Sequence, residues 1–169
     1  MESCKIVAMK KIILIRHAKS SWEHNVSDLE RPISKRGYND ANLMVGILNN
    51  FSTDIDAVFS SSSKRTLETA KIFLDNLINY QNLKVIKSED LYDFYGNKVD
   101  LFIKNLNNDL DTVMIFSHNN SCNNLLIKYG KVINVHVPTS GMLIFEFDVS
   151  LWNDVKSGNC KYFFPKKFK

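Results

Sequence analysis

The feature that most limits the fold of this chain is a run of four large apolar residues, Ile12-Ile13-Leu14-Ile15, which ends at Arg16-His17. A run this short predicts a β-strand buried on both faces, because a buried helix would need at least about ten residues. Such strands belong to parallel sheets, which bind ligands just beyond the carboxyl ends of their strands. The run therefore predicts a guanidinium and an imidazole side by side at a ligand-binding edge. A strand that simply ends in two polar residues would give the same local pattern.

Segments with strand-like and helix-like apolar spacing alternate along the rest of the chain, and Ser34 is the expected N-cap of the first helix. This alternation predicts an α/β fold, a three-layer α/β/α sandwich with a mostly parallel central sheet. We expect one domain over residues 1–169, in which residues 1–9 form a short N-terminal extension. The further strands are expected at 55–59, 83–86, 112–116 and 142–147, and the segment 159–164 has the pattern of an edge strand.

The composition is typical of a globular protein, with 44% hydrophobic and 24% charged residues. The net charge of +4 is modest, and no basic and aromatic pattern indicates a nucleic-acid partner. No apolar run approaches the ~18 residues of a membrane span, and the first residues do not resemble a signal peptide. The cysteines Cys4, Cys122 and Cys160 form neither a zinc pattern nor a disulfide framework. We therefore expect a cytoplasmic protein with no metal or other cofactor and no membrane partner.

Arginine is rare in this chain and unevenly placed. Only four of the 22 basic residues are arginines, and all four precede position 66. Arginine is used in place of lysine where a planar, bidentate donor must bind an oxyanion, although chance alone could also place four residues in this way. The four are Arg16, Arg31, Arg36 and Arg65, of which Arg36 falls in the first turn of a helix and is expected to pair with a carboxylate.

Three predicted strands end in residues suited to phosphate. Arg16 and His17 follow the first strand, Arg65 lies just beyond the second, and His118 lies beyond the fourth. Because the carboxyl ends of parallel strands share one edge of a sheet, these four side chains are expected to converge. The helix after His118 would add backbone N–H groups and the positive end of its dipole. The sequence thus predicts an anion pocket formed by these residues. The other two histidines, His24 and His136, are expected to be structural or exposed.

Five blocks carry a resemblance to a known family: Arg16–Trp22, Asp28–Gly37, Ser60–Ala70, Leu91-Tyr92 and Ser117–Asn119. In this order and spacing they resemble the histidine phosphatase superfamily, and within it the small SixA-type phosphohistidine phosphatases. The similarity extends from about residue 10 to residue 148. It implies a phosphoglycerate mutase-like fold in which His17 becomes transiently phosphorylated while Arg16, Arg65 and His118 hold the phosphoryl oxygens. Arg31, Ser20 and Asn119 are expected to contribute to substrate binding.

The general acid is not identified by a family motif. Larger relatives carry a Glu after the third strand, where this chain offers Glu89, Asp90 and Asp93, each of which could also be an ordinary loop carboxylate. An alkoxide leaving group needs a proton from such an acid, whereas the imidazole of phosphohistidine is a better leaving group because histidine protonates near pH ~6.5. The lack of a clear acid therefore favours phosphohistidine as the substrate.

These observations predict a metal-independent phosphatase that works through a phosphohistidine enzyme intermediate on phosphohistidine in a protein. No long insertion covers the pocket, which favours a protein substrate over a small phosphorylated metabolite. A non-catalytic phosphate-binding module is the other alternative, and the intact His17 argues against it. Asp54 and Asp56 precede a strand, whereas the aspartates of aspartyl-phosphate phosphatases follow one. The Cys-x5-Arg pattern of cysteine phosphatases is absent, because the residues six positions beyond the cysteines are Lys10, Lys128 and Lys166.

Overall fold

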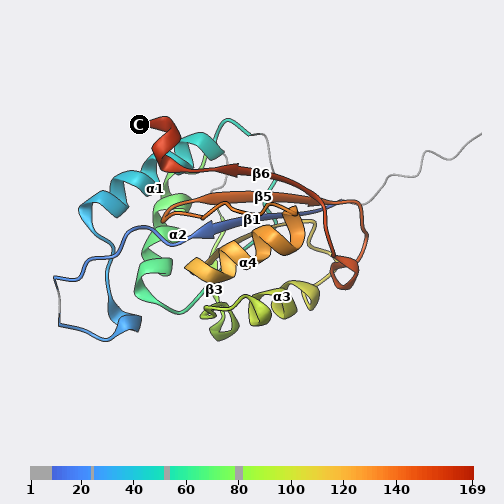
Figure 1. Ribbon diagram of the computed structural model, residues 1–169, viewed down its shortest axis with the longest axis horizontal. Coiled ribbons are helices and arrows are strands. Elements are labelled where there is room, and N and C mark those ends of the chain that lie inside the picture. The colour runs from blue at the N-terminus through green and yellow to red at the C-terminus, as the bar shows by residue number, and fades with distance from the viewer. Residues whose placement is uncertain (1–8, 24, 52–53, 79–81) are drawn as a thin grey trace, which may run out of the picture.

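The computed structural model describes residues 9–23, 25–51, 54–78 and 82–169, so that Cys4, His24 and most of the expected extension lie outside it. A six-stranded sheet in the order β3-β2-β4-β1-β5-β6 forms the centre of the fold (Figure 1). The strands are β1 (Lys10–Arg16), β2 (Ala57–Ser60), β3 (Val85–Lys87), β4 (Thr112–Ser117), β5 (Met142–Phe147) and β6 (Asn159–Phe163).

The sheet is mixed and mostly parallel, as predicted. Strand β1 pairs in parallel with β4, β4 with β2, and β2 with β3. Strand β5 pairs antiparallel with β1, and β6 pairs antiparallel with β5 as the edge strand expected from residues 159–164. The chain thus keeps four parallel carboxyl ends together at one edge of the sheet, where parallel sheets bind their ligands.

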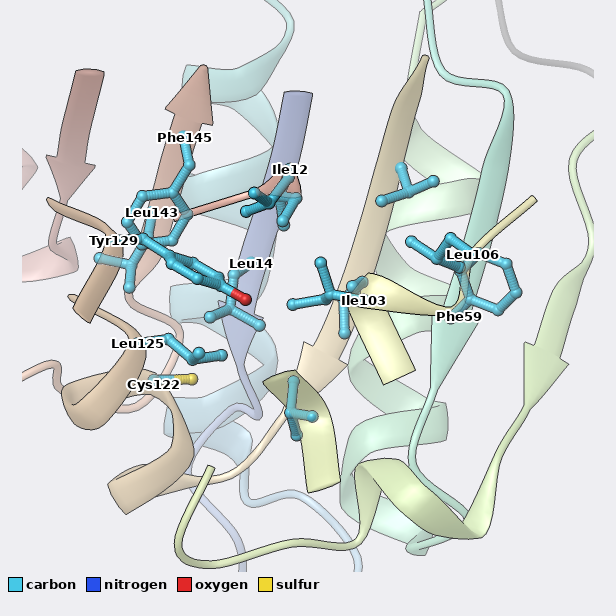
Figure 2. Packing of buried hydrophobic residues seen from close by; sticks show 14 of the residues in the cluster. Ile12, Leu14, Phe59, Ile103, Leu106, Cys122, Leu125, Tyr129, Leu143 and Phe145 are labelled. Atoms are coloured by element: carbon cyan, nitrogen blue, oxygen red, sulfur yellow. The ribbon is translucent and has the colours of Figure 1, made fainter. Parts of the chain in front are cut away.

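Helices cover both faces of the sheet and give the expected three layers. One face packs against α1 and α2 through residues such as Met44 and Phe73, and the other packs against α3 and α4. On this second face, Figure 2 shows Leu14 of β1 near Tyr129 of α4 and Ile103 of α3. The helices are α1 (Lys35–Leu48), α2 (Lys64–Asn76), α3 (Asn97–Lys104) and α4 (Asn119–Gly130), with short 3-10 turns η1 (Asp28–Glu30), η2 (Glu89–Leu91), η3 (Trp152–Asp154) and η4 (Pro165–Phe168).

The first turns of α1 and α2 are fixed by serine caps. The Ser34 side chain accepts a hydrogen bond from the Gly37 N–H, as predicted for the N-cap of α1, and Ser63 does the same for the Thr66 N–H of α2. Gly37 has no room for a side chain, because a Cβ atom there would overlap the carbonyl oxygen of Lys19. This close approach holds the start of α1 directly against the loop that leaves β1.

The register of the parallel strands aligns the residues that begin the functional loops. Arg16 at the end of β1 lies beside Ser117 at the end of β4, and Ser60 of β2 lies beside Phe116. The residues that follow, His17, His118 and Ser61, therefore emerge side by side. None of the helices in the described ranges is long and apolar enough to cross a membrane.

Candidate active site

The four side chains predicted to converge do lie together at the carboxyl edge of the sheet. The rings of His17 and His118 have centroids 5.4 Å apart. One guanidinium nitrogen of Arg65, Nη2, lies 3.3 Å from Nδ1 of His118. Arg65 and His118 are almost completely buried, and His17 is only 8% exposed. Three strand ends, distant in sequence, thus form one largely buried cationic pocket.

The His17 ring is held in one tautomer. Its Nδ1 lies 2.8 Å from the carbonyl oxygen of Ala18, which can only accept, so Nδ1 carries the proton and Nε2 keeps a free lone pair. The pKa of His17 is lowered to about 3, mainly by burial and also by the charges of Arg65 and Arg16, while the bond to Ala18 acts against them. The ring is therefore neutral near pH 7 and able to act as a nucleophile.

His118 is neutral for similar reasons. Burial lowers its pKa to about 2, and His17 and the nearby Arg65 act in the same direction. Arg65 can only donate, so Nδ1 of His118 accepts, and Nε2 is the protonated nitrogen that donates to the Ser61 hydroxyl at 2.8 Å. The ring of Phe94 packs over His118 with a centroid distance of 4.8 Å. These contacts fix the orientation of the second imidazole.

Arg16 and Arg65 each bring a buried N–H that no atom of the described residues satisfies. Nη1 of Arg16 donates to the Val137 carbonyl at 2.7 Å and lies 3.4 Å from Nε2 of His136, but the Nε atoms of both arginines are buried without a partner. A buried, unsatisfied donor is costly, and in a native site it points to a group that binds there. The desolvation of Arg16 also lowers its pKa from the usual value. An oxyanion is a group of the kind that accepts from such donors.

Asp28 connects Arg31, Arg65 and Tyr92 through hydrogen bonds to its carboxylate. Its Oδ1 accepts from Nε and Nη2 of Arg31, while Oδ2 accepts from Arg65 at 2.9 Å and from the Tyr92 hydroxyl at 2.7 Å. Burial alone would raise the pKa of Asp28, but the hydrogen bonds from Tyr92, Arg31 and Arg65 outweigh it and hold that pKa well below its usual range. Asp28 is therefore an ionised carboxylate at the mouth of a cationic pocket.

The expected substrate-binding residues occupy the rim. Nη1 of Arg31 donates to the Ser20 hydroxyl at 2.7 Å, and its guanidinium stacks on the exposed Trp22 ring at 3.7 Å. Asn119 is the first residue of α4, directly after His118, and its side chain accepts a 3.4 Å hydrogen bond from Asn123. Arg36 does not join the pocket contacts and lies 3.6 Å from the Asp40 carboxylate, the kind of pairing expected for it.

The three candidate acids lie in different settings. Asp93 is buried, and its carboxylate accepts from the backbone N–H groups of Tyr95, Lys98 and Val99, so it anchors the start of α3 instead of facing solvent. Glu89 is exposed and accepts from the Ser62 hydroxyl at 2.9 Å. Asp90 is exposed beside it. None of the three makes a hydrogen bond to His17 or His118 within the described part of the chain.

The sequence left three pocket residues without a role: Asp28, Tyr92 and His136. Asp28 and Tyr92 stood inside the family-like blocks, but their mutual bond joins positions 64 residues apart, which only the folded chain reveals. His136 is exposed, as expected for it, yet it borders the pocket through its contact with Arg16. Over the described residues, no three His, Cys, Asp or Glu side chains are grouped as metal ligands. The fold and these side chains define an α/β protein with two histidines and three arginines gathered at the carboxyl edge of its parallel strands.

A family model for the histidine phosphatase superfamily (branch 1) matches residues 12–100, more than half of the 169-residue chain. The chain therefore belongs to the histidine phosphatase superfamily, which confirms the family that its sequence blocks resemble. An uncharacterized protein of Mycobacterium tuberculosis is 26% identical in an alignment of 155 positions that covers 85% of this chain and 93% of that relative.

Solved structures support the same fold. The protein histidine phosphatase SixA in complex with tungstate superposes with a TM-score of 0.71 and 21% identity, over 94% of this chain and 99% of the other. A SixA-type protein from Agrobacterium tumefaciens gives 0.70 and 19%, over 80% and 90% of the two chains. These similarities confirm the phosphoglycerate mutase-like fold.

Proposed function

We propose that this protein is a phosphatase that forms a phosphohistidine intermediate on His17 and acts on phosphohistidine in a protein. The observation that carries the proposal is the neutral His17 ring, whose proton is held on Nδ1 by Ala18 inside a pocket with two unsatisfied arginine N–H groups. A binding module would need the arginines but not a nucleophile in this tautomer. A histidine nucleophile splits phosphoryl transfer into two easier displacements.

In the first displacement, Nε2 of His17 bonds to phosphorus, and the bond from phosphorus to the leaving group breaks with its electron pair on the leaving atom. Arg16 and Arg65 neutralise the phosphoryl oxygens, which is most of what such a transition state requires. In the second, a water oxygen bonds to phosphorus, and the electron pair of the P–N bond returns to Nε2. Inorganic phosphate then leaves, and His17 is again neutral with its proton on Nδ1.

The leaving group is where the site favours phosphohistidine over a phosphate ester. An ester needs an acid to protonate its departing oxygen. Asp93 is occupied by the start of α3, and Asp28 is ionised by its three donor residues. A phosphorylated imidazole that is already protonated on its second nitrogen departs as neutral imidazole and needs no such acid. The SixA name of structurally similar proteins is consistent with this choice.

The test compares the wild type with His17→Ala on a histidine-phosphorylated protein, an aryl phosphate and an alkyl phosphate, each with and without EDTA. We expect the wild type to hydrolyse the phosphohistidine protein equally well with and without EDTA, and the alkyl phosphate far more slowly. Turnover of the phosphohistidine protein should fall by at least about 10³-fold in His17→Ala. Radiolabelled phosphate should remain on the wild type, but not on the variant, after a rapid alkaline quench.

Each alternative has its own outcome. Turnover of the aryl and alkyl phosphates but not of the phosphohistidine protein would keep the intermediate and assign a small metabolite as substrate. Absence of turnover on all three, with inorganic phosphate still bound by the wild type, would overturn the proposal in favour of a binding module. Comparable turnover of phosphohistidine and of the alkyl phosphate would overturn the argument from the missing acid.

A further inference from the structure

The mouth of the pocket contains an ionised carboxylate where an ester phosphatase would need a proton donor. The Asp28 side chain is 47% exposed, so it borders both the pocket and solvent. Arg31, Arg65 and Tyr92 each donate a hydrogen bond to the Asp28 carboxylate. The neutral His118 lies nearby, and the exposed Glu30 belongs to the same 3-10 turn as Asp28. A carboxylate in this position cannot protonate a leaving oxygen, but it can stabilise a positive charge.

The role of Asp28 follows from the net charge of the site when a phosphoryl group is bound. Arg16, Arg31, Arg65 and Asp28 together carry a net charge of +2, which a bound phosphoryl group with two negative charges would balance. Asp28 forms ion pairs with two of these arginines, with Arg31 at 2.7 Å and with Arg65 at 2.9 Å. Without the carboxylate, Arg31 would present an unbalanced positive charge to the leaving group.

We infer that Asp28 determines the leaving group: its carboxylate offsets Arg31 at the mouth and so admits a cationic ring, the protonated imidazole of phosphohistidine. The inference rests on the proposed function and adds the residue that selects the substrate. The Tyr92 hydroxyl is the only neutral donor to this carboxylate among the described residues. When the substrate binds, the N–H of its imidazolium ring would donate to Asp28 in place of Tyr92 or beside it.

The transfer balances without a protein acid. The ring of the substrate enters with one nitrogen bonded to phosphorus and the other bonded to hydrogen, and it carries one positive charge. As Nε2 of His17 bonds to phosphorus, the electron pair of the old N–P bond returns to the leaving nitrogen. The ring departs as neutral imidazole with its proton in place. An opposite charge within about 4–6 Å favours the protonated ring, because it raises the pKa of that ring by about one unit or more.

The test is Asp28→Asn, assayed on N-phosphorylimidazole and on p-nitrophenyl phosphate across a range of pH. Glu30→Gln is the matched control, because it removes the same charge from the same exposed turn, two residues away. We expect kcat/KM of Asp28→Asn to fall about tenfold more on N-phosphorylimidazole than on p-nitrophenyl phosphate, because any loss of arginine positioning affects both substrates and cancels in the ratio. The alkaline limb of kcat on N-phosphorylimidazole should move to lower pH by about one unit.

The two substrates separate this role from a merely structural one. If Asp28 only positioned Arg31 and Arg65, the variant would lose activity on both substrates equally and the alkaline limb would stay in place, and either result would overturn the inference. An equal effect of Glu30→Gln would overturn it as well. Wild-type protein that hydrolyses p-nitrophenyl phosphate but not N-phosphorylimidazole would overturn the proposed substrate together with this inference. A change confined to Asp28→Asn would leave both standing.

Discussion

Strand β1 carries a cationic side chain at each end, the buried Lys10 and the half-buried Arg16, and their hydrogen-bond donors are satisfied to different degrees. At its start, Nζ of Lys10 donates to the carbonyls of Asn108 and Leu110 and to the Asp111 carboxylate, all within 3.0 Å. At its end, Arg16 satisfies one nitrogen with the Val137 carbonyl and leaves Nε buried without a partner. A lysine has three protons to place, and here all three are placed.

The difference teaches how to separate structural from functional charge within one strand. Every proton of Lys10 is satisfied by protein atoms, and Trp152 packs near its ammonium group at 5.6 Å. Such a site is complete and has no capacity for a ligand. At the other end, Nε of Arg16 and Nε of the neighbouring Arg65 are buried without an acceptor among the described residues. A buried donor without an acceptor lowers stability, and an anion that binds there would remove this cost. The unsatisfied end is therefore the one that we assign to catalysis.

The largest expected effect tests the unsatisfied end. Replacing Arg65 with Met should lower kcat/KM for phosphoryl substrates by about 10³-fold, because one main donor to the phosphoryl oxygens is lost. The free energy of unfolding should fall by about 1–2 kcal/mol, because Nδ1 of His118 loses its donor, while Asp28 keeps its bonds to Arg31 and the apolar Met fills the buried space. Enzyme assays and urea unfolding of the same preparations measure the two quantities.

Arg65→Lys is the matched control for that experiment, because it keeps the charge but loses the planar fork. An intermediate loss of activity in this variant would assign part of the effect to geometry. A large loss of stability in Arg65→Met, with little loss of activity, would contradict the assignment of this end of the sheet to catalysis.

The second effect tests the satisfied end. Lys10→Met should lower the free energy of unfolding by about 3 kcal/mol, since it removes a charge-assisted bond and leaves the Asn108 carbonyl without its partner. The Leu110 carbonyl keeps the Trp152 indole N–H as a donor. At a temperature where both proteins are folded, kcat/KM should stay within about twofold of the wild type. A marked loss of activity in the folded variant would contradict the separation of the two ends.

Much of this contrast was accessible from the sequence, because it follows from strand ends. The apolar run at 12–15 fixed the place of Arg16 and His17, and the β-α order brought Arg65 and His118 to the same edge. The antiparallel direction of β5 was not accessible, because a buried strand reads as a continuous apolar run in either direction. That direction depends on how the loop before Met142 returns to β1, and the sequence pattern does not record it.

The parts of the site that the sequence missed depend on contacts between distant loops. Asp28 looks like one more loop carboxylate until α2 and the loop after η2 bring Arg65 and Tyr92 to it, from 37 and 64 residues away. Asp93 was grouped with the candidate acids because it lies in the right segment. Its hydrogen bonds to the start of α3 follow from the left-handed turn at Gly96, where φ is 92°. A tertiary ion pair and a local turn each decided the role of a carboxylate.

The smallest effect sharpens the comparison through pH. Both imidazoles have pKa values below that of the unfolded chain, so protonation below pH ~6.5 favours unfolding, and their contribution to stability is lost as pH falls from about 6.5 toward 3. The decrease in the free energy of unfolding between pH 7 and 5.5 should therefore be about 1 kcal/mol smaller in His118→Asn than in the wild type. Urea unfolding at the two pH values measures this difference, in which the carboxylates common to both proteins cancel. In the double variant His17→Asn/His118→Asn, this decrease in the free energy of unfolding should be smaller by a second increment of similar size, because each buried neutral ring contributes separately.

If the pH dependence of the variants matched that of the wild type, the two rings would be protonated in the folded protein at pH 5.5. His17 would then lack the free lone pair that the proposed mechanism requires there.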